Sequence, residues 1–247
     1  MCVLAFAWRA DPRWLWVLAG NRDELHARPA EPLHRWPDAS QVLAGRDVQS
    51  GGSWLGVSEQ GRMAVVTNIS GYGPPAPDAP SRGDLVKDAL IGSGPYAALD
   101  PAEAARFNPF NLVRVDGAEA TLWSNRPGVE HRLLAPGVMG LSNGQGPEPW
   151  PKTARLMQRL SAWLAEPGPA PRALLDALGE VAPPPGAEAM PEGGGRTGVF
   201  VKRPVYGTRC STVAAVDAAG CGVIVERRFD AEGRQTGQSE LEFVWPI

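Results

Sequence analysis

Apolar runs interrupted by turn residues predict β-strands at both ends of the chain. Residues 2–8 and 14–20 are apolar and flank a turn-rich stretch, so the N-terminus is predicted to form a β-hairpin. Three more strands are predicted near the C-terminus, at residues 208–217, 222–229 and 240–245.

The middle of the chain is predicted to hold two further hairpins and four helices. The hairpins pair residues 53–57 with 62–68 and residues 111–115 with 120–124. The helices are expected at residues 81–90, at a short segment that starts at Asp100 and ends before Asn108, and at residues 151–166 and 172–181. In the third helix, Lys152, Arg155 and Arg159 are predicted to lie outside the apolar face.

This order of elements favours a layered α+β fold over alternating βαβ units, because strand pairs stand at both ends and helices in the middle. No linker separates two self-sufficient halves, so residues 1–247 are predicted to form a single domain.

Charge and composition narrow the possible partners. Lys and Arg total 24 against 27 Asp and Glu, a net charge of -3, which does not favour the basic surface of a nucleic-acid binder. No apolar run approaches the roughly 20 residues of a membrane span. Three scattered cysteines, Cys2, Cys210 and Cys221, do not suit a disulfide framework, and the histidines lack metal-ligand spacing. Cys221 is expected in the core. We therefore expect a cytoplasmic protein without a metal or a resident cofactor.

Two short patterns match known functional motifs, but the predicted elements around them do not fit those functions. Residues 193–198 match the dinucleotide-binding pattern G-x-G-x-x-G, but they follow a proline-rich loop, so a mobile loop is expected there. Residues 140–144 match G-x-S-x-G, but no helix follows at once and all three histidines precede Ser142. A catalytic triad is therefore not expected.

Cys2 is the most informative single residue. Removal of the initiator methionine ahead of this small residue would leave a thiol and a free α-amine on Cys2. The thiolate is a nucleophile, and an amine with a pKa of about 8 can move its proton without a histidine. The alternative is a buried, inert cysteine at the start of a strand, which is common in proteins.

A charged tetrapeptide with the sequence NRDE occupies residues 21–24, where the second strand ends. Because this strand runs antiparallel to the first, the tetrapeptide should lie near Cys2. Arg22 could lower the pKa of the thiol and bind a substrate carboxylate, and Asp23 could hold or orient the α-amine. The alternative is a solvated turn with a local ion pair.

Six short motifs follow one another along the chain. They are Met1-Cys2, NRDE at 21–24, GGSWLG at 51–56, NPFNL at 108–112, LSN at 141–143 and YGTRCST at 206–212. In this order they resemble the NRDE family, whose animal members are called transport and Golgi organisation protein 2. The resemblance runs from residue 2 to about residue 229, and the ordered set makes it specific.

The resemblance implies an α+β fold of the N-terminal-nucleophile (Ntn) hydrolase type, with four layers (αββα) and two packed antiparallel sheets. It also implies that Cys2 is the nucleophile and Asp23 its orienting acid. Such hydrolases have an Arg-x-x-Asp spacing that is not present here, so the roles of Arg22, Asp23 and Glu24 stay open.

Further site residues follow from the same resemblance. Asn68 and Asn143 resemble the asparagines that stabilise a tetrahedral oxyanion, and Arg209 resembles a late arginine placed beside the nucleophile. Together with Cys2, these residues predict a hydrolase-like protein that cleaves an amide or thioester (acyl) bond of a small molecule. Arg22 and Arg209 would then favour the thiolate and an anionic substrate.

The alternative is a non-enzymatic protein that binds and traffics haem or a lipid or acyl-CoA. The resemblance carries this possibility, since family members have been linked to haem trafficking and to acyl-CoA or lipid handling. The nine tryptophans could hold haem in a cleft, although the sequence has no Cys-x-x-Cys-His motif. An adaptor with a relict active site is a third possibility.

Overall fold

The computed structural model describes residues 2–144, 148–190 and 196–247, which divide into two compact units. The first unit comprises Met1–Arg28 and Pro136–Glu242, and the second comprises Pro29–Ala135 and Phe243–Ile247. Each unit contains one antiparallel sheet and its own helices. The prediction of a mobile loop at 193–198 lies outside the described residues for its first half, residues 193–195.

The sheet of the first unit has six strands in the order β10-β1-β2-β11-β12-β13. Their bounds are Gly137–Leu141 (β10), Cys2–Asp11 (β1), Trp14–Leu25 (β2), Tyr206–Asp217 (β11), Cys221–Phe229 (β12) and Gln235–Val244 (β13). β1 pairs antiparallel with both β10 and β2, and β11 pairs antiparallel with β2 and β12. The N-terminal hairpin and the three C-terminal strands predicted from the sequence are thus confirmed, in one sheet.

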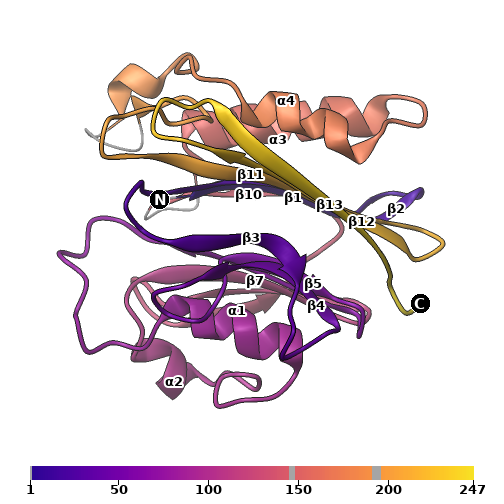
Figure 1. The fold of residues 1–247 in the computed structure, drawn as a ribbon, viewed down its shortest axis with the longest axis horizontal. Coiled ribbons are helices and arrows are strands. Elements are labelled where there is room, and N and C mark those ends of the chain that lie inside the picture. The colour runs from indigo at the N-terminus through magenta and orange to yellow at the C-terminus, as the bar shows by residue number, and fades with distance from the viewer. Residues whose placement is uncertain (1, 145–147, 191–195) are drawn as a thin grey trace. The chain divides into compact units, whose positions relative to one another are not determined.

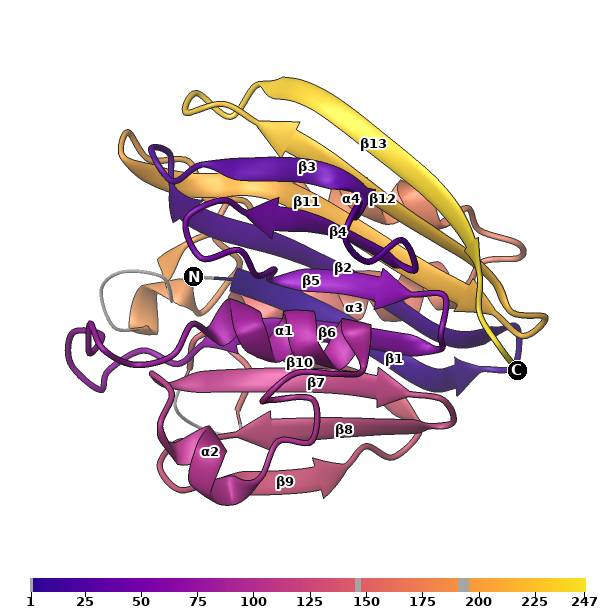
Figure 2. The ribbon, with the colours of Figure 1, turned by 60° about the horizontal axis from the view of Figure 1, so that its bottom comes forward.

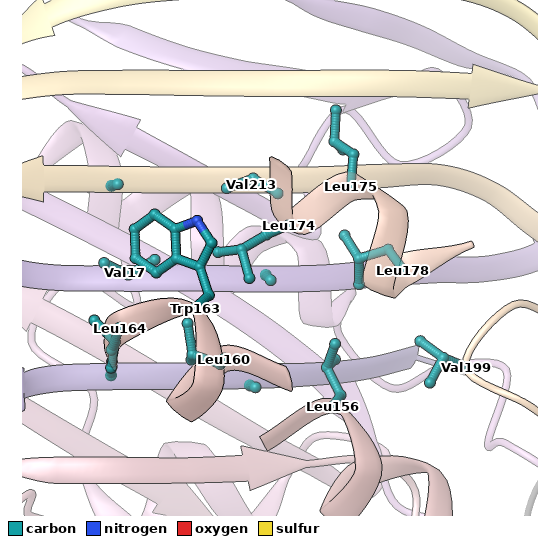
Figure 3. Packing of buried hydrophobic residues seen from close by; sticks show 14 of the residues in the cluster. Val17, Leu156, Leu160, Trp163, Leu164, Leu174, Leu175, Leu178, Val199 and Val213 are labelled. Carbon is teal, nitrogen blue, oxygen red and sulfur yellow. The ribbon is translucent and has the colours of Figure 1, made fainter. Parts of the chain in front are cut away.

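Two helices, α3 (Pro151–Ala165) and α4 (Leu174–Leu178), cover one face of this sheet (Figure 1). The helices contribute leucines and Trp163 to a buried cluster, and the strands contribute every second residue (Figure 3). The strand members are Val3, Ala5, Ala7, Val17, Ala19, Val213, Ala215 and Val225. Because side chains alternate along a strand, this cluster defines which residues of β1, β2 and β11 face the helices.

The sheet of the second unit has seven strands in chain order from β3 to β9. Their bounds are Ala30–Arg35, Val42–Asp47, Leu55–Ser58, Arg62–Asn68, Phe110–Asp116, Glu119–Ser124 and Glu130–Leu133. Helix α1 (Arg82–Ile91) lies against β5 and β6 (Figure 2), and the short α2 is Pro101–Ala105. Ser81 caps α1, and Asp100 forms a capping box with Glu103 in α2. Both predicted helix starts are confirmed.

The close packing of Gly52 against α1 explains the second glycine of the GGSWLG motif. A Cβ atom at Gly52 would lie 2.4 Å from the carbonyl carbon of Gly83, in the first turn of α1. We expect Gly52→Ala to lower the free energy of unfolding by about 2–3 kcal/mol, because backbone atoms must move apart to admit the methyl group. Urea denaturation measures the loss. Gly128→Ala is the matched control, since a Cβ there meets no atom within 4 Å, and an equal loss in both variants would contradict the close approach.

The structure corrects two predicted elements. The helix expected at 172–181 is instead a 3-10 turn, Pro171–Ala173, followed by the short α4, which ends at Leu178 with Gly179 as its C-cap. The next residue, Glu180, accepts the backbone N–H of Phe200, and this long-range bond overrides the local helical pattern. Cys221, expected in the core, is exposed where β12 begins beside the turn at Asp217.

Four strands were not predicted: β3, β4, β9 and β10. The edge strand β3 contains Pro32, and the side chains of β9 are all exposed, so neither has the apolar alternation of a half-buried strand. Among the described residues, no helix is both long and apolar enough to cross a lipid bilayer.

Candidate active site

Cys2 is the first residue of β1 and is partly exposed. Its backbone N–H donates a hydrogen bond of 3.2 Å to Oδ1 of Asn143. Asn143 follows β10, which pairs with β1 along the sheet edge, and its side chain is fully buried. The structure therefore brings two predicted site residues, Cys2 and Asn143, into direct contact through the atom that would become the α-amine.

Arg22 lies between two cysteines in the sheet. It is the cross-strand partner of Cys2 on β1 and of Cys210 on β11, so the three side chains share one face of the sheet. Val17 and Ala19 of β2 face the helices, so the alternation places Arg22 on the opposite face. Arg22 is 6% exposed and forms a 3.9 Å ion pair with Glu24, whose side chain is 28% exposed.

Asp23 lies on the other face, toward the helices. A β-bulge separates Thr208 from Cys210, so that Thr208 pairs with Asp23 while Cys210 pairs with Arg22. Thr208 Oγ1 donates a 2.7 Å hydrogen bond to Oδ1 of Asp23, which is 1% exposed. The solvated turn considered for residues 21–24 is thus wrong for Arg22 and Asp23, which are both buried.

Asn21 is a structural clamp. Its Nδ2 donates to the carbonyl oxygens of Leu178 at 2.9 Å and Val199 at 3.0 Å. Its Oδ1 accepts a 2.6 Å hydrogen bond from Ser211 Oγ. The amide thereby ties the end of α4 and the segment before β11 to the sheet.

Lys152 contradicts the sequence-based prediction. It was expected outside the apolar face of its helix, but it lies in the first turn of α3 and is fully buried. Its Nζ donates to Thr197 Oγ1 at 3.3 Å, and its charge acts on Asp23 and on Cys2. Helical periodicity failed here because the first turn of α3 lies against the polar end of the sheet rather than against the leucine cluster.

Arg209 and Asn68 are the two remaining predicted site residues. Arg209 is the extra residue of the β11 bulge, and its Nη1 donates to the carbonyl oxygens of Leu25, His26 and Arg28. It therefore supports the backbone that follows β2. Asn68 ends β6 in the second unit. The catalytic roles of both residues stay predictions.

Burial dominates the titration of the Cys2 thiol and raises its pKa above the ordinary value. The carboxylate of Asp23 raises this pKa further, whereas the Arg22 guanidinium lowers it. The expectation that Arg22 favours the thiolate is correct in sign, but burial outweighs it. At neutral pH the group is therefore mainly a thiol, which needs a proton acceptor before it can attack.

The raised pKa has a measurable consequence. We expect the rate of Cys2 alkylation by iodoacetamide to keep rising through pH 9, by about tenfold per pH unit, because only the thiolate reacts. Peptide mass spectrometry after timed quenching measures this rate, with the exposed Cys221 as an accessible-thiol reference. A plateau of the Cys2 rate below pH 8 would show that the thiol is already ionised and would contradict the dominance of burial.

Within the described ranges, no three His, Cys, Asp or Glu side chains gather in a way that could hold a metal ion. The charged side chains of the site instead pair with one another and with hydroxyl groups. Its chemistry resides in a thiol, a carboxylate, an ammonium, a guanidinium and an amide.

The sequence of this chain was compared with protein-family models and with known proteins. The family model described as Transport and Golgi organisation 2 matches residues 1–231. The chain belongs to this family. Its Transport and Golgi organisation 2 relatives include a homologue from Bos taurus, 35% identical with 92% of each chain covered. A homologue from Homo sapiens is 31% identical, also with 92% of each chain covered.

Solved structures similar to this chain include three proteins of the Ntn-hydrolase fold. An N-acylethanolamine-hydrolyzing acid amidase orthologue from Caenorhabditis elegans has a TM-score of 0.52 at 12% identity, covering 86% of this chain and 92% of its own. Penicillin V acylase from Agrobacterium tumefaciens gives 0.51 at 12% identity, with 97% and 91% covered. A mutant conjugated bile acid hydrolase from Clostridium perfringens gives 0.53 at 7% identity, with 98% and 92% covered. The predicted Ntn-hydrolase fold is thus confirmed for this Transport and Golgi organisation 2 member.

Proposed function

We propose that this chain is an Ntn-type cysteine hydrolase that cleaves an amide or thioester (acyl) bond of a small molecule. The observation that carries the proposal is the contact between Cys2 N and Asn143 Oδ1, at the start of β1, where the partly exposed residue Cys2 lies opposite Arg22 in the sheet. The fold shared with solved amidases and acylases supports the same reaction class.

The reaction begins with removal of Met1, which turns the Cys2 nitrogen into an α-amine. This amine accepts the thiol proton, and the thiolate attacks the acyl carbonyl carbon. Arg22 stabilises the thiolate through its positive charge. Asn143 positions the amine through Oδ1, so its Nδ2 is the part of the side chain that can donate to the developing oxyanion.

The tetrahedral intermediate then collapses. The bond from the carbonyl carbon to the leaving nitrogen or sulfur breaks, and the α-ammonium gives its proton to that leaving group. Water, deprotonated by the same amine, then attacks the acyl carbon of the acyl-cysteine. The bond from this carbon to Cys2 Sγ breaks, the thiolate takes the proton from the α-ammonium, and a carboxylic acid is released. Asn68 as a second oxyanion donor and Arg209 as a guide for an anionic substrate remain parts of the proposal.

Turnover of acyl substrates tests the proposal. The purified chain is incubated with matched p-nitrophenyl esters, acyl thioesters and anilides of short and long fatty acids, and product is followed beyond one equivalent of protein. Multiple turnovers with at least one acyl class are expected. Release of no product above the rate of heat-denatured protein for every acyl class would overturn the proposal.

Binding and trafficking of haem or a lipid or acyl-CoA is the second candidate function. Six of the nine tryptophans, Trp8, Trp16, Trp36, Trp123, Trp163 and Trp245, are buried, which leaves three with the exposure that a ligand cleft requires. A haem titration distinguishes the two functions. A shifted Soret band would favour the carrier function, and an unshifted band would leave no support for haem binding. A cytoplasmic location stays a prediction.

A further inference from the structure

Two opposite charges are buried together behind the proposed active site. Asp23, at the end of β2, is 1% exposed, and Lys152, in the first turn of α3, is 0% exposed. The burial of either charge alone is strongly unfavourable, whereas a paired and hydrogen-bonded arrangement compensates much of that cost. The helix and the strand therefore bring a lysine to Asp23, whose carboxylate the family resemblance predicts to be the orienting acid.

The contacts around the pair favour the charged forms of both groups. Asp23 Oδ1 accepts from Thr208 Oγ1 at 2.7 Å, and Lys152 Nζ donates to Thr197 Oγ1 at 3.3 Å. Burial raises the pKa of Asp23, and Lys152 is the largest opposing influence, ahead of Thr208 and Arg22.

The influences on Lys152 mirror those on Asp23. Burial lowers the pKa of Lys152, and the charges of Asp23 and Cys2 oppose this effect. Arg203, in the segment before β11, adds a repulsive positive charge. The carboxylate is thus the main partner for the ammonium group in a site that otherwise disfavours its charge.

We propose that Lys152 is a positioning residue of the Cys2 site, where its ammonium group keeps the buried Asp23 carboxylate ionised so that Asp23 can hold the α-amine of processed Cys2. This inference rests on the proposed function. It gives the lysine no contact with the substrate. Lys152 acts through Asp23, from the helix-facing side of the sheet, while the thiol lies on the opposite face.

The sign of the expected pH effect follows from the charges. Without Lys152, the pKa of Asp23 rises further, so that a larger fraction of Asp23 is protonated at mildly acidic pH. A protonated Asp23 no longer compensates the α-ammonium, and acylation declines. The acidic limb of the pH–rate profile for Cys2 acylation should therefore move to higher pH.

Lys152→Met is the direct test, with Lys202→Met as the control because Lys202 is exposed. The rate of Cys2 acylation by a p-nitrophenyl ester is measured from pH 4.5 to 9.5. We expect the acidic limb of Lys152→Met to shift upward by at least about one pH unit, with the alkaline plateau within about threefold of the unchanged protein. Lys202→Met should overlay the unchanged protein, and Lys152→Arg should restore the limb.

The outcomes separate this inference from the proposed function. If Cys2 in the unchanged chain is not acylated, the hydrolase proposal fails. If it is acylated but the limb of Lys152→Met does not move, only the role of Lys152 is overturned. If Lys152→Met fails to fold, adding Asp23→Asn should restore at least about tenfold in the folding equilibrium constant, since both charges then disappear together. Absence of that recovery would overturn the pairing.

Discussion

Cys2→Ala is expected to reduce acylation by an activated ester by at least about 10³-fold. Removal of a covalent nucleophile costs this much or more when the remaining site can only bind and orient the substrate. Alanine is small, so removal of Met1 should proceed as before and the α-amine is retained. Stability should change by less than about 1 kcal/mol, because Cys2 begins its strand and is partly exposed. Stopped-flow release of p-nitrophenol measures the acylation rate.

Cys221→Ala is the matched control for this prediction. Cys221 also begins a strand and is more exposed than Cys2, so its replacement removes an accessible thiol without touching the proposed site. Acylation of this variant should equal that of the unchanged protein. If Cys2→Ala retains full labelling, the nucleophile lies elsewhere, and Cys210, opposite Arg22 in the sheet, becomes the next candidate.

Asn21→Ala is expected to lower the free energy of unfolding by about 3–4 kcal/mol. The substitution removes three hydrogen bonds in a buried place and leaves the carbonyl groups of Leu178 and Val199 without this donor. An unsatisfied buried polar group costs about 1–3 kcal/mol, and the lost volume adds to this cost. Urea denaturation at constant pH measures the change.

Asn108→Ala is the control for the clamp, because the side chain of Asn108 also makes two hydrogen bonds, both to Ala76, but in an exposed loop. It should lose less than about 1 kcal/mol. Similar losses for Asn21→Ala and Asn108→Ala would contradict the view that the first NRDE residue is a buried tie between sheet and helix layer.

The residues of the NRDE tetrapeptide point alternately to the two faces of the sheet, because side chains alternate along a strand. Asn21 and Asp23 lie on the face toward α3 and α4, where Asn21 binds the end of α4 and Asp23 is under the influence of the Lys152 charge. Arg22 lies on the face of Cys2, and Glu24 pairs with it. Consecutive residues of one strand thus serve both faces of the sheet, as the pleat requires.

Much of the fold could be predicted because its signals are local. The hairpin of β1 and β2 is visible as two apolar runs around a turn, and the starts of α1 and α2 are visible as capping residues Ser81 and Asp100. The strands β3 and β9 could not be predicted, because their pairing partners rather than their own patterns make them strands.

The candidate site was predictable only in part. The proximity of Cys2 to residues 21–24 follows from the antiparallel hairpin. The burial of Lys152 does not, since it depends on where the first turn of α3 meets the sheet. The β11 bulge that turns Thr208 toward Asp23 also has no local signature, because a bulge is defined only by the register with the neighbouring strand.

The location of the trapped acyl group tests the central claim most directly. The protein is mixed with an acyl thioester, quenched in acid within seconds, digested with trypsin and analysed by mass spectrometry. Cys2 falls in the peptide of residues 2–9, whereas Cys210 and Cys221 share residues 210–227. The account predicts an acyl group on a 2–9 peptide that begins at Cys2, without Met1. An acyl group confined to residues 210–227 would contradict it.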